Sequence, residues 1–363
     1  MNLPRRPGLP EAVALPAALV ERRLVGLFDA EEARWGAVDR DLADLVGALR
    51  SAVLGGGKRL RPVFCYWAFV GAGGNPEDPA MLDAGAALEM LHAAALIHDD
   101  LIDRSTRRHG AVTAHVASAA RHRGEGWRGD SERFGAAVAI LLGDLALAYC
   151  DQLLDGAPHA AAHVFSEARV EVNVGQYLDV LSTASGPAPS AEDAAARARQ
   201  IARFKTAKYT VERPLHLGAA LASPAASSEL VGPLSAFGLP LGEAFQLHDD
   251  LLGVFGDPET TGKPVGDDLR EGKPTLLVAL ALAAIGGADT RLFAERLGAP
   301  DLSDSEVAEM QRLIESSGAR AGVERSIAAL TSAAFAALEW LPILPEARGA
   351  LGEVARFVAG RDH

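Results

Sequence analysis

Apolar residues recur every three or four positions along most of this chain, a spacing that turns one face of an α-helix towards a core. The run Trp35, Val38, Leu42, Leu45, Leu49 and Val53 shows this spacing. Alternating strand patterns are almost absent, alanine and leucine are abundant, and aromatic residues make up only 6% of the chain. The pattern predicts a single large all-α bundle.

Glycine- and proline-rich stretches divide this pattern into segments. The stretch GGGKRLRP (55–62) interrupts the first helices, and 71–79 is a loop before the next one. Further helices are predicted at about 135–155, 159–184, 191–213, 227–255, 274–286, 303–318, 319–342 and 345–359, the 191–213 helix with Ser190 as its N-cap. We expect residues 1–50 to form a helical N-terminal part and 121–135 to be a mobile surface loop. No linker divides the chain, so 1–363 is predicted to be one domain.

Charge and cysteine content exclude several classes of protein. The formal net charge of the 363 residues is -13, which argues against nucleic acid as a partner because a basic surface would be required. An anionic small ligand stays possible where metal ions and local arginines neutralise it. Cys65 and Cys150 are too few for a disulfide framework and are expected to be buried thiols. Without a signal-peptide pattern or an uncharged run of about 18 residues, the protein is predicted to be cytoplasmic, with no membrane span.

Acidic side chains are concentrated in the apolar stretch ALIHDDLIDRSTRRHG (95–110). Asp99 and Asp103 lie one helical turn apart, and Asp100, His92 and Glu89 fall on the same side of the helix. Unpaired carboxylates are costly to bury, so a cation is expected between them. Oxygen ligands at this spacing suit Mg²⁺, which takes one or two carboxylates and shares its remaining positions with water and phosphate.

The letters HDDL return in FQLHDDLLGVFGD (245–257). Gln246, Asp249 and Asp250 share one helix face at positions i, i+3 and i+4. The segment TGKPVGDDLREGK (261–273) follows and adds lysines and aspartates on a glycine-containing loop. A solvated helix face paired with surface lysine or arginine is the alternative for either cluster alone. Two clusters of the same form, both within apolar sequence, favour metal sites.

Basic residues accompany both acidic clusters. Lys58, Arg59 and Arg61 follow a glycine run at a helix start, where backbone N–H groups and arginine side chains bind phosphate. Arg107, Arg108 and His109 come directly after the first acidic cluster. An ordinary exposed turn would also contain such residues. Together with two acidic faces, however, they predict a pocket for at least one diphosphate.

These motifs resemble those of the trans-isoprenyl diphosphate synthases (polyprenyl synthetases), in the same order and over about residues 50–280. The matching segments are GGKRLRP, DDLID, GD (143–144), GQYLD (175–179), KTAKYT (205–210) and FQLHDDLLGVFGD. The resemblance implies the family's fold, a bundle of antiparallel helices around a central cavity. It also implies Mg²⁺ as cofactor, two diphosphate substrates and a homodimer.

The resemblance implies a role for each matching residue. Mg²⁺ ligands are Asp99, Asp100, Asp103, Asp249 and Asp250, which act in catalysis together with Lys205, Thr206 and Gln246. Isopentenyl diphosphate contacts are Lys58, Arg61 and His92. Contacts to the allylic substrate and its pocket are Arg108, Lys263, Gln176 and Asp179, with Asp267 as a supporting acid. Two positions depart from the family: His109 stands where a second arginine is usual, and Gly253 where many members have a third aspartate.

The implied reaction is head-to-tail elongation of an allylic diphosphate by isopentenyl diphosphate. In this family, bulky residues four and five places before the first aspartate stop the growing chain early. Those places are Ala95 and Ala94, so geranylgeranyl diphosphate (C20) or a longer product is expected.

Three other functions were compatible with part of the pattern. A class I terpene cyclase shares the fold and a first aspartate motif, but its second motif is typically an Asn/Ser/Glu triad. A non-catalytic regulatory subunit of a heteromeric prenyl synthase generally loses the aspartate motifs, which this chain keeps. A metal-dependent phosphohydrolase would need additional histidine ligands on separate helices.

Overall fold

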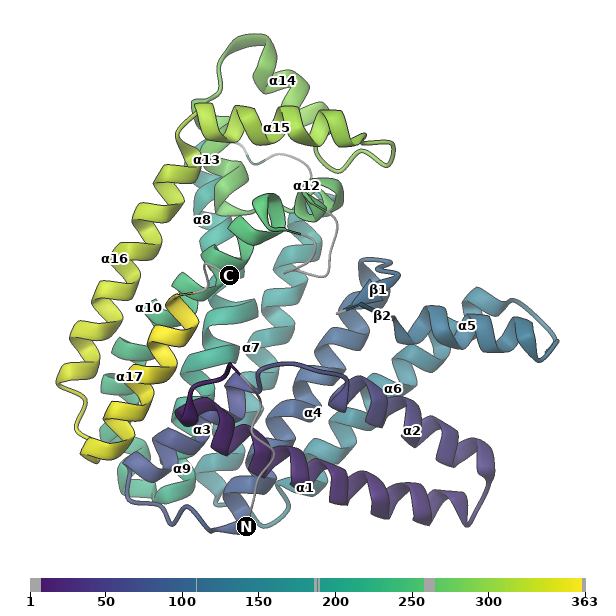
Figure 1. Ribbon diagram of the computed structural model, residues 1–363, viewed down its shortest axis with the longest axis vertical. Coiled ribbons are helices and arrows are strands. Elements are labelled where there is room, and N and C mark those ends of the chain that lie inside the picture. The colour runs from purple at the N-terminus through teal and green to yellow at the C-terminus, as the bar shows by residue number, and fades with distance from the viewer. Residues whose placement is uncertain (1–7, 109, 186–187, 189, 258–264, 361–363) are drawn as a thin grey trace. The chain divides into compact units, whose positions relative to one another are not determined.

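The protein is almost entirely helical, as Figure 1 shows. The structure is a computed structural model that describes residues 8–108, 110–185, 188, 190–257 and 265–360. By its packing the chain divides into two compact units, described separately here. Unit 1 comprises Met1–Ala162 and Leu217–Ser227, and unit 2 comprises His163–His216 and Ser228–His363. The all-α prediction is confirmed, and the single-domain assignment stays a prediction.

Unit 1 is built around the apolar helix α4. Its helices are α1 (Glu11–Gly36), α2 (Arg40–Leu54), α3 (Leu60–Gly71), α4 (Pro79–Ile102), α5 (Ala114–Gly124) and α6 (Ser131–Leu153), with the end of α9 (Arg213–Ala222) and the start of α10 (Pro224–Phe255). Helix α4 packs against α1, α3 and α6, and α5 packs on α6. Phe28, Phe64 and Met81 are fully buried in this core. Cys65 and Cys150 are free and buried, as predicted.

Unit 2 contains most of α7 (His159–Ala184), then α8 (Ala191–Ile201) and the wide π-helix η1 (Ala202–Glu212). It continues with the greater part of α10 and with α12 (Asp267–Glu271), α13 (Leu276–Ala284), α14 (Gly287–Arg296), α15 (Asp304–Ser316), α16 (Ala319–Glu339) and α17 (Pro345–Ala359). Helix α13 packs against α8 and α16, and Phe293 and Ile314 are fully buried in this core. Ser190 caps α8 by accepting a hydrogen bond from the Asp193 backbone N–H (3.0 Å), as predicted.

Three local predictions were wrong. The helix expected across Trp35–Val53 is broken after Gly36, because Asp39 caps a new helix, and Val38 is 70% exposed in the turn. The expected loop 121–135 is mostly helical: α5 runs to Gly124, and the Asp130 side chain caps α6. The continuous helix expected over 191–213 changes at Ala202 into the π-helix.

The only strands within the described residues form a two-residue hairpin of β1 (Arg107–Arg108) and β2 (Ala111–Val112). It follows α4 directly, so it carries Arg108 back towards the end of that helix.

Two helices, α4 and α6, are long and apolar enough to cross a membrane by length and composition. In α4, 67% of the most apolar window is buried, and in α6 the share is 39%. Core helices of folded proteins meet the same criterion, so this is weak evidence for a membrane span.

Candidate active site

The first acidic set lies at the C-terminal end of α4. Asp99 and Asp100 are in its last turn, and Asp103 is the residue that ends it. The Arg108 side chain donates through Nε to Asp100 Oδ1 (2.6 Å) and through Nη2 to Asp99 Oδ2 (3.4 Å). Burial raises the pKa of the Asp100 carboxyl, and the neighbouring Asp99 adds to this, whereas Arg108 opposes it. The hairpin therefore brings one predicted substrate residue, Arg108, onto two predicted metal ligands.

Three carboxylates at this end of a helix oppose the helix dipole, whose negative end lies there. Their position fits a cation site better than a stabilising structural cluster.

The second acidic set lies near the C-terminal end of α10, entirely in unit 2. Asp250 is 7% exposed, and Gln246 Nε2 donates to its Oδ1 (2.6 Å). Burial, then the negative charges of Asp268 and Asp249, raise the pKa of Asp250 to about 8. Lys273 lies 3.3 Å from Asp268 and opposes this effect. A buried carboxyl whose neighbours are carboxyls is a site that a divalent cation would stabilise, so this donor set fits Mg²⁺.

The sequence analysis placed Asp268 on the 261–273 loop but gave it no role. Asp267 was assigned the supporting role, but the structure buries Asp268 (8% exposed) beside Asp250, while Asp267 is half-exposed. The adjacent aspartates at 267 and 268 were both visible in the sequence as candidates for this role. Gly266, at φ 71°, sets the direction in which α12 starts and hence which aspartate points inwards.

The π-helix η1 joins several predicted residues of unit 2. Lys205 Nζ donates to Asp179 Oδ2 on α7 (2.6 Å), and Thr206 Oγ1 donates to Gln246 Oε1. Gln246 in turn donates to Asp250, so a hydrogen-bonded chain leads from η1 to the second acidic set. Gln176 is half-buried on α7, one turn before Asp179.

Close helix packing makes these contacts possible. A Cβ on Gly175 would lie 2.4 Å from the Lys205 backbone nitrogen, and a Cβ on Gly242 would lie 2.6 Å from Ala207 Cα. Only glycine permits α7 and α10 to approach η1 this closely. Glu171, which the sequence analysis missed, binds Lys208 and, through a two-pronged contact at 2.6 and 2.7 Å, Arg213.

The basic loop of unit 1 precedes α3. Lys58 is exposed and Arg61 is half-buried, whereas Arg59 between them is buried and bonded to Glu89 of α4. His92 is half-buried one turn after Glu89. The structure thus joins the loop to the helix that carries His92 and the first acidic set.

The two alanines predicted to govern product length differ in environment. Ala94 is 1% exposed within the core, while Ala95 is partly exposed.

Two predicted substrate residues, His109 and Lys263, lie outside the described residues. Among the residues that are described, no three His, Cys, Asp or Glu side chains converge as a ready-made metal site.

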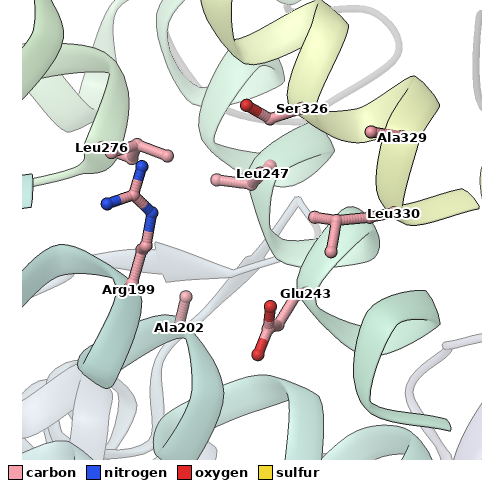
Figure 2. Close-up of a pocket in the computed structure, with 8 residues that line it drawn as sticks. All are labelled: Arg199, Ala202, Glu243, Leu247, Leu276, Ser326, Ala329 and Leu330. Atoms are coloured by element: carbon pink, nitrogen blue, oxygen red, sulfur yellow. The ribbon is translucent and has the colours of Figure 1, made fainter. Parts of the chain in front are cut away.

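The best-defined cavity of unit 2, of about 260 Å³, contains none of the predicted residues. Figure 2 shows Arg199, Glu243 and Ser326 around it among apolar side chains, with Leu247, Leu276, Leu330, Ala202 and Ala329 completing its lining. A wider groove of about 750 Å³ lies between the ends of α10, α16 and α17.

Comparison with known proteins gives consistent results. The sequence profile of the Polyprenyl synthetase family matches residues 43–314. A geranylfarnesyl diphosphate synthase from Aeropyrum pernix is 33% identical over 284 residues, covering 76% of this chain and 80% of that protein. A (2E,6E)-farnesyl diphosphate synthase from Mycobacterium tuberculosis is 36% identical over 271 residues, covering 73% of this chain and 68% of that protein.

A solved structure extends the similarity over nearly the whole chain. A geranylgeranyl pyrophosphate synthase from Corynebacterium glutamicum, complexed with isoprenyl diphosphate and magnesium, matches with a TM-score of 0.87 and 39% identity. The match covers 97% of this chain and 100% of that one.

An all-α scaffold with aspartate sets at two helix ends and a glycine-rich basic loop defines the isoprenoid synthase class of fold. The chain belongs to the polyprenyl synthetase family. It is therefore an enzyme, a transferase of the trans-prenyl diphosphate synthase type, and the resemblance noted from its motifs is confirmed.

Proposed function

We propose that this protein condenses isopentenyl diphosphate with an allylic diphosphate, head to tail, to make geranylgeranyl diphosphate (C20) or a longer trans-polyprenyl diphosphate. The observation that carries the proposal is the presence of both aspartate sets. The first lies at the C-terminal end of α4, where carboxylates are unfavourable without a cation, and the second contains the buried Asp250, whose neighbours are also carboxyls. A non-catalytic relative would have no reason to keep them.

Each proposed residue has a separate task. Lys58, Arg61 and His92 hold the diphosphate of isopentenyl diphosphate. Mg²⁺ held by Asp99, Asp100, Asp103, Asp249 and Asp250 would supply the positive charge that stabilises the departing pyrophosphate. Arg108 and Lys263 assist at the allylic diphosphate, with Asp267 and Asp268 as supporting acids.

The chemical step balances without a protein base. The allylic C1–O bond breaks, the double bond of isopentenyl diphosphate attacks C1, and loss of a proton restores a double bond in a chain five carbons longer. The released pyrophosphate can accept that proton. Thr206 and Gln246, already bonded to each other, offer oxygen dipoles to the carbocation, and Lys205 is held by Asp179 for contact with the allylic substrate.

The product length of C20 or more rests on Ala95 and Ala94, because a small side chain at these places does not stop the growing tail as a bulky one would.

We further propose a cytoplasmic homodimer. On α7, Val170, Val174 and Tyr177 are exposed in a row at positions i, i+4 and i+7, the last at 64%. An apolar row of this kind is typical of an interface. Free buried cysteines accord with a reducing compartment. Light scattering after size exclusion would test the dimer, with a monomeric mass contradicting it.

The decisive experiment is product analysis. Purified protein is incubated with Mg²⁺, labelled isopentenyl diphosphate and, separately, dimethylallyl, geranyl or farnesyl diphosphate, and the dephosphorylated products are sized. We expect a C20 or longer product that disappears with a chelator and in Asp99→Ala and Asp249→Ala. Elongation from none of the starters by folded protein would overturn the proposal and favour a cyclase or a regulatory subunit.

A further inference from the structure

The buried ion pair between Arg59 and Glu89 is the feature of unit 1 that the proposed mechanism does not use. Arg59 Nη1 lies 2.6 Å from Glu89 Oε2, and the side chains are 4% and 2% exposed. Arg59 belongs to the glycine-rich loop before α3, and Glu89 lies in the middle of α4. Burying both charges is costly, so this pair needs an explanation beyond stability.

The backbone conformation of Arg59 is also unusual. Its φ of 54° is left-handed, and within the described chain only one other non-glycine residue, Arg104, has a positive φ. Gly56 and Gly57 just before it also have positive φ values. A non-glycine residue keeps such a conformation only where its surroundings impose it. Here the bond to Glu89 holds the side chain inwards.

The consequence falls on the neighbours of Arg59. With Arg59 turned into the protein, Lys58 before it is exposed, and Arg61 after it is half-buried. Helix α4 also approaches the start of α3 at Gly85, one turn before Glu89: a Cβ on Gly85 would lie 3.2 Å from Pro62 Cβ. Gly85, Glu89 and His92 therefore form one side of α4 that faces the start of α3.

We propose that Arg59 and Glu89 are positioning residues: their ion pair attaches the basic loop to α4 and so aligns Lys58 and Arg61 with His92 for binding isopentenyl diphosphate. Arg59 itself does not touch substrate. This inference rests on the proposed function, because it assigns these three side chains to that substrate.

Binding and amide exchange together test the proposal. Glu89→Gln removes the charge and keeps the shape. We expect the Kd for isopentenyl diphosphate, titrated in EDTA without turnover, to rise about tenfold or more, as for loss of a bond to a charged group. The KM for the allylic diphosphate should stay within about twofold, and amides of residues 55–61 should exchange about tenfold faster.

The control is Asp83→Asn, which breaks another, more exposed ion pair of α4, between Arg23 Nε of α1 and Asp83 Oδ1 (2.5 Å), and not one with the loop. It should change none of these quantities. If Glu89→Gln misfolds, the double variant Arg59→Gly with Glu89→Leu replaces it. Glycine accepts the φ at position 59, and no buried charge is left without a partner.

Two results would overturn the proposal. One is unchanged exchange at 55–61 in a folded variant without the pair, and the other is a Kd for isopentenyl diphosphate that rises no more than the KM for the allylic diphosphate. The proposed function fails separately, through absence of elongation by the wild-type protein. In that case the exchange rates still decide whether the pair holds the loop.

Discussion

The carboxylate of Asp268 occupies the space that a side chain on Gly253 would need. A Cβ built on Gly253 would lie 2.0 Å from Asp268 Oδ2 and 2.4 Å from its Cγ. A carboxylate from α12 therefore lies beside α10 at that point.

Gly253→Ala should therefore weaken the second acidic set. The added methyl group must displace Asp268, which is buried and bonded to Lys273. Overpacking of this kind costs about 1–3 kcal/mol. We expect a lower melting temperature and a raised KM for the allylic substrate. Gly36→Ala serves as the control for adding a methyl group to a helical glycine, since its Cβ would meet only Ala43 Cβ at 3.3 Å. Unchanged stability and kinetics in Gly253→Ala would contradict the packing described here.

Substitutions at the two alanines of α4 should separate product length from stability. Phenylalanine at Ala95, which is partly exposed, should shorten the product to C15 with little change in folding. At Ala94, 1% exposed, the same ring has no room and should destabilise the protein by about 1–3 kcal/mol or more. Product sizing and thermal unfolding measure the two effects. The contrast fails if Ala94→Phe shortens the product while leaving stability intact.

The effects of substitutions at His98 and Gly143 on the free energy of unfolding should not be additive. A Cβ on Gly143 would lie 2.0 Å from His98 Nε2. The same nitrogen is hydrogen-bonded to the Ile140 carbonyl (3.2 Å), and His98 directly precedes Asp99 in the sequence. Gly143→Ala should cost about 1–3 kcal/mol and lower activity by moving His98. In a double-mutant cycle, adding His98→Ala should remove most of that cost, because the methyl group then has space. Additive losses would show that the clash is relieved in another way.

Glu171 should make stability depend on acid pH. Burial alone would raise its pKa, but hydrogen bonds from Arg213 and Lys208 outweigh this and lower the pKa below the ordinary 4.5. The ionised form is thus favoured by folding. Its contribution is complete above about pH 4.5 and is lost as the pH falls through the lowered pKa.

Glu171→Gln tests this directly. At pH 7 it should destabilise unit 2 by about 3 kcal/mol, because Lys208 and Arg213 lose their partner. Between pH 5 and pH 3 its melting temperature should fall less steeply than that of the wild type. The control is Glu306→Gln. It removes another carboxyl whose pKa is lowered, to about 2, but this carboxyl belongs to an exposed capping box. Parallel curves for wild type and Glu171→Gln would exclude the assignment.

Sequence alone determined the all-α fold class, most of the helices and the family. Helical spacing, the cap at Ser190 and the two HDDL motifs are local signals, and a residue's neighbours in sequence suffice to interpret them. The family and its all-α fold followed from the same motifs. The local prediction was wrong at the break between Gly36 and Arg40. It was also wrong over most of 121–135, where α5 runs to Gly124 and the Asp130 cap starts α6 at Ser131.

Only the tertiary structure decided which way the charged side chains point. Arg59 turns inwards because Glu89, 30 positions away, neutralises it, and Lys58 beside it is exposed. Asp268 rather than Asp267 joins Asp250 because α12 packs where Gly253 leaves space. Burial and ion pairing depend on groups brought together from distant parts of the chain, and no pattern within a single segment contains that information.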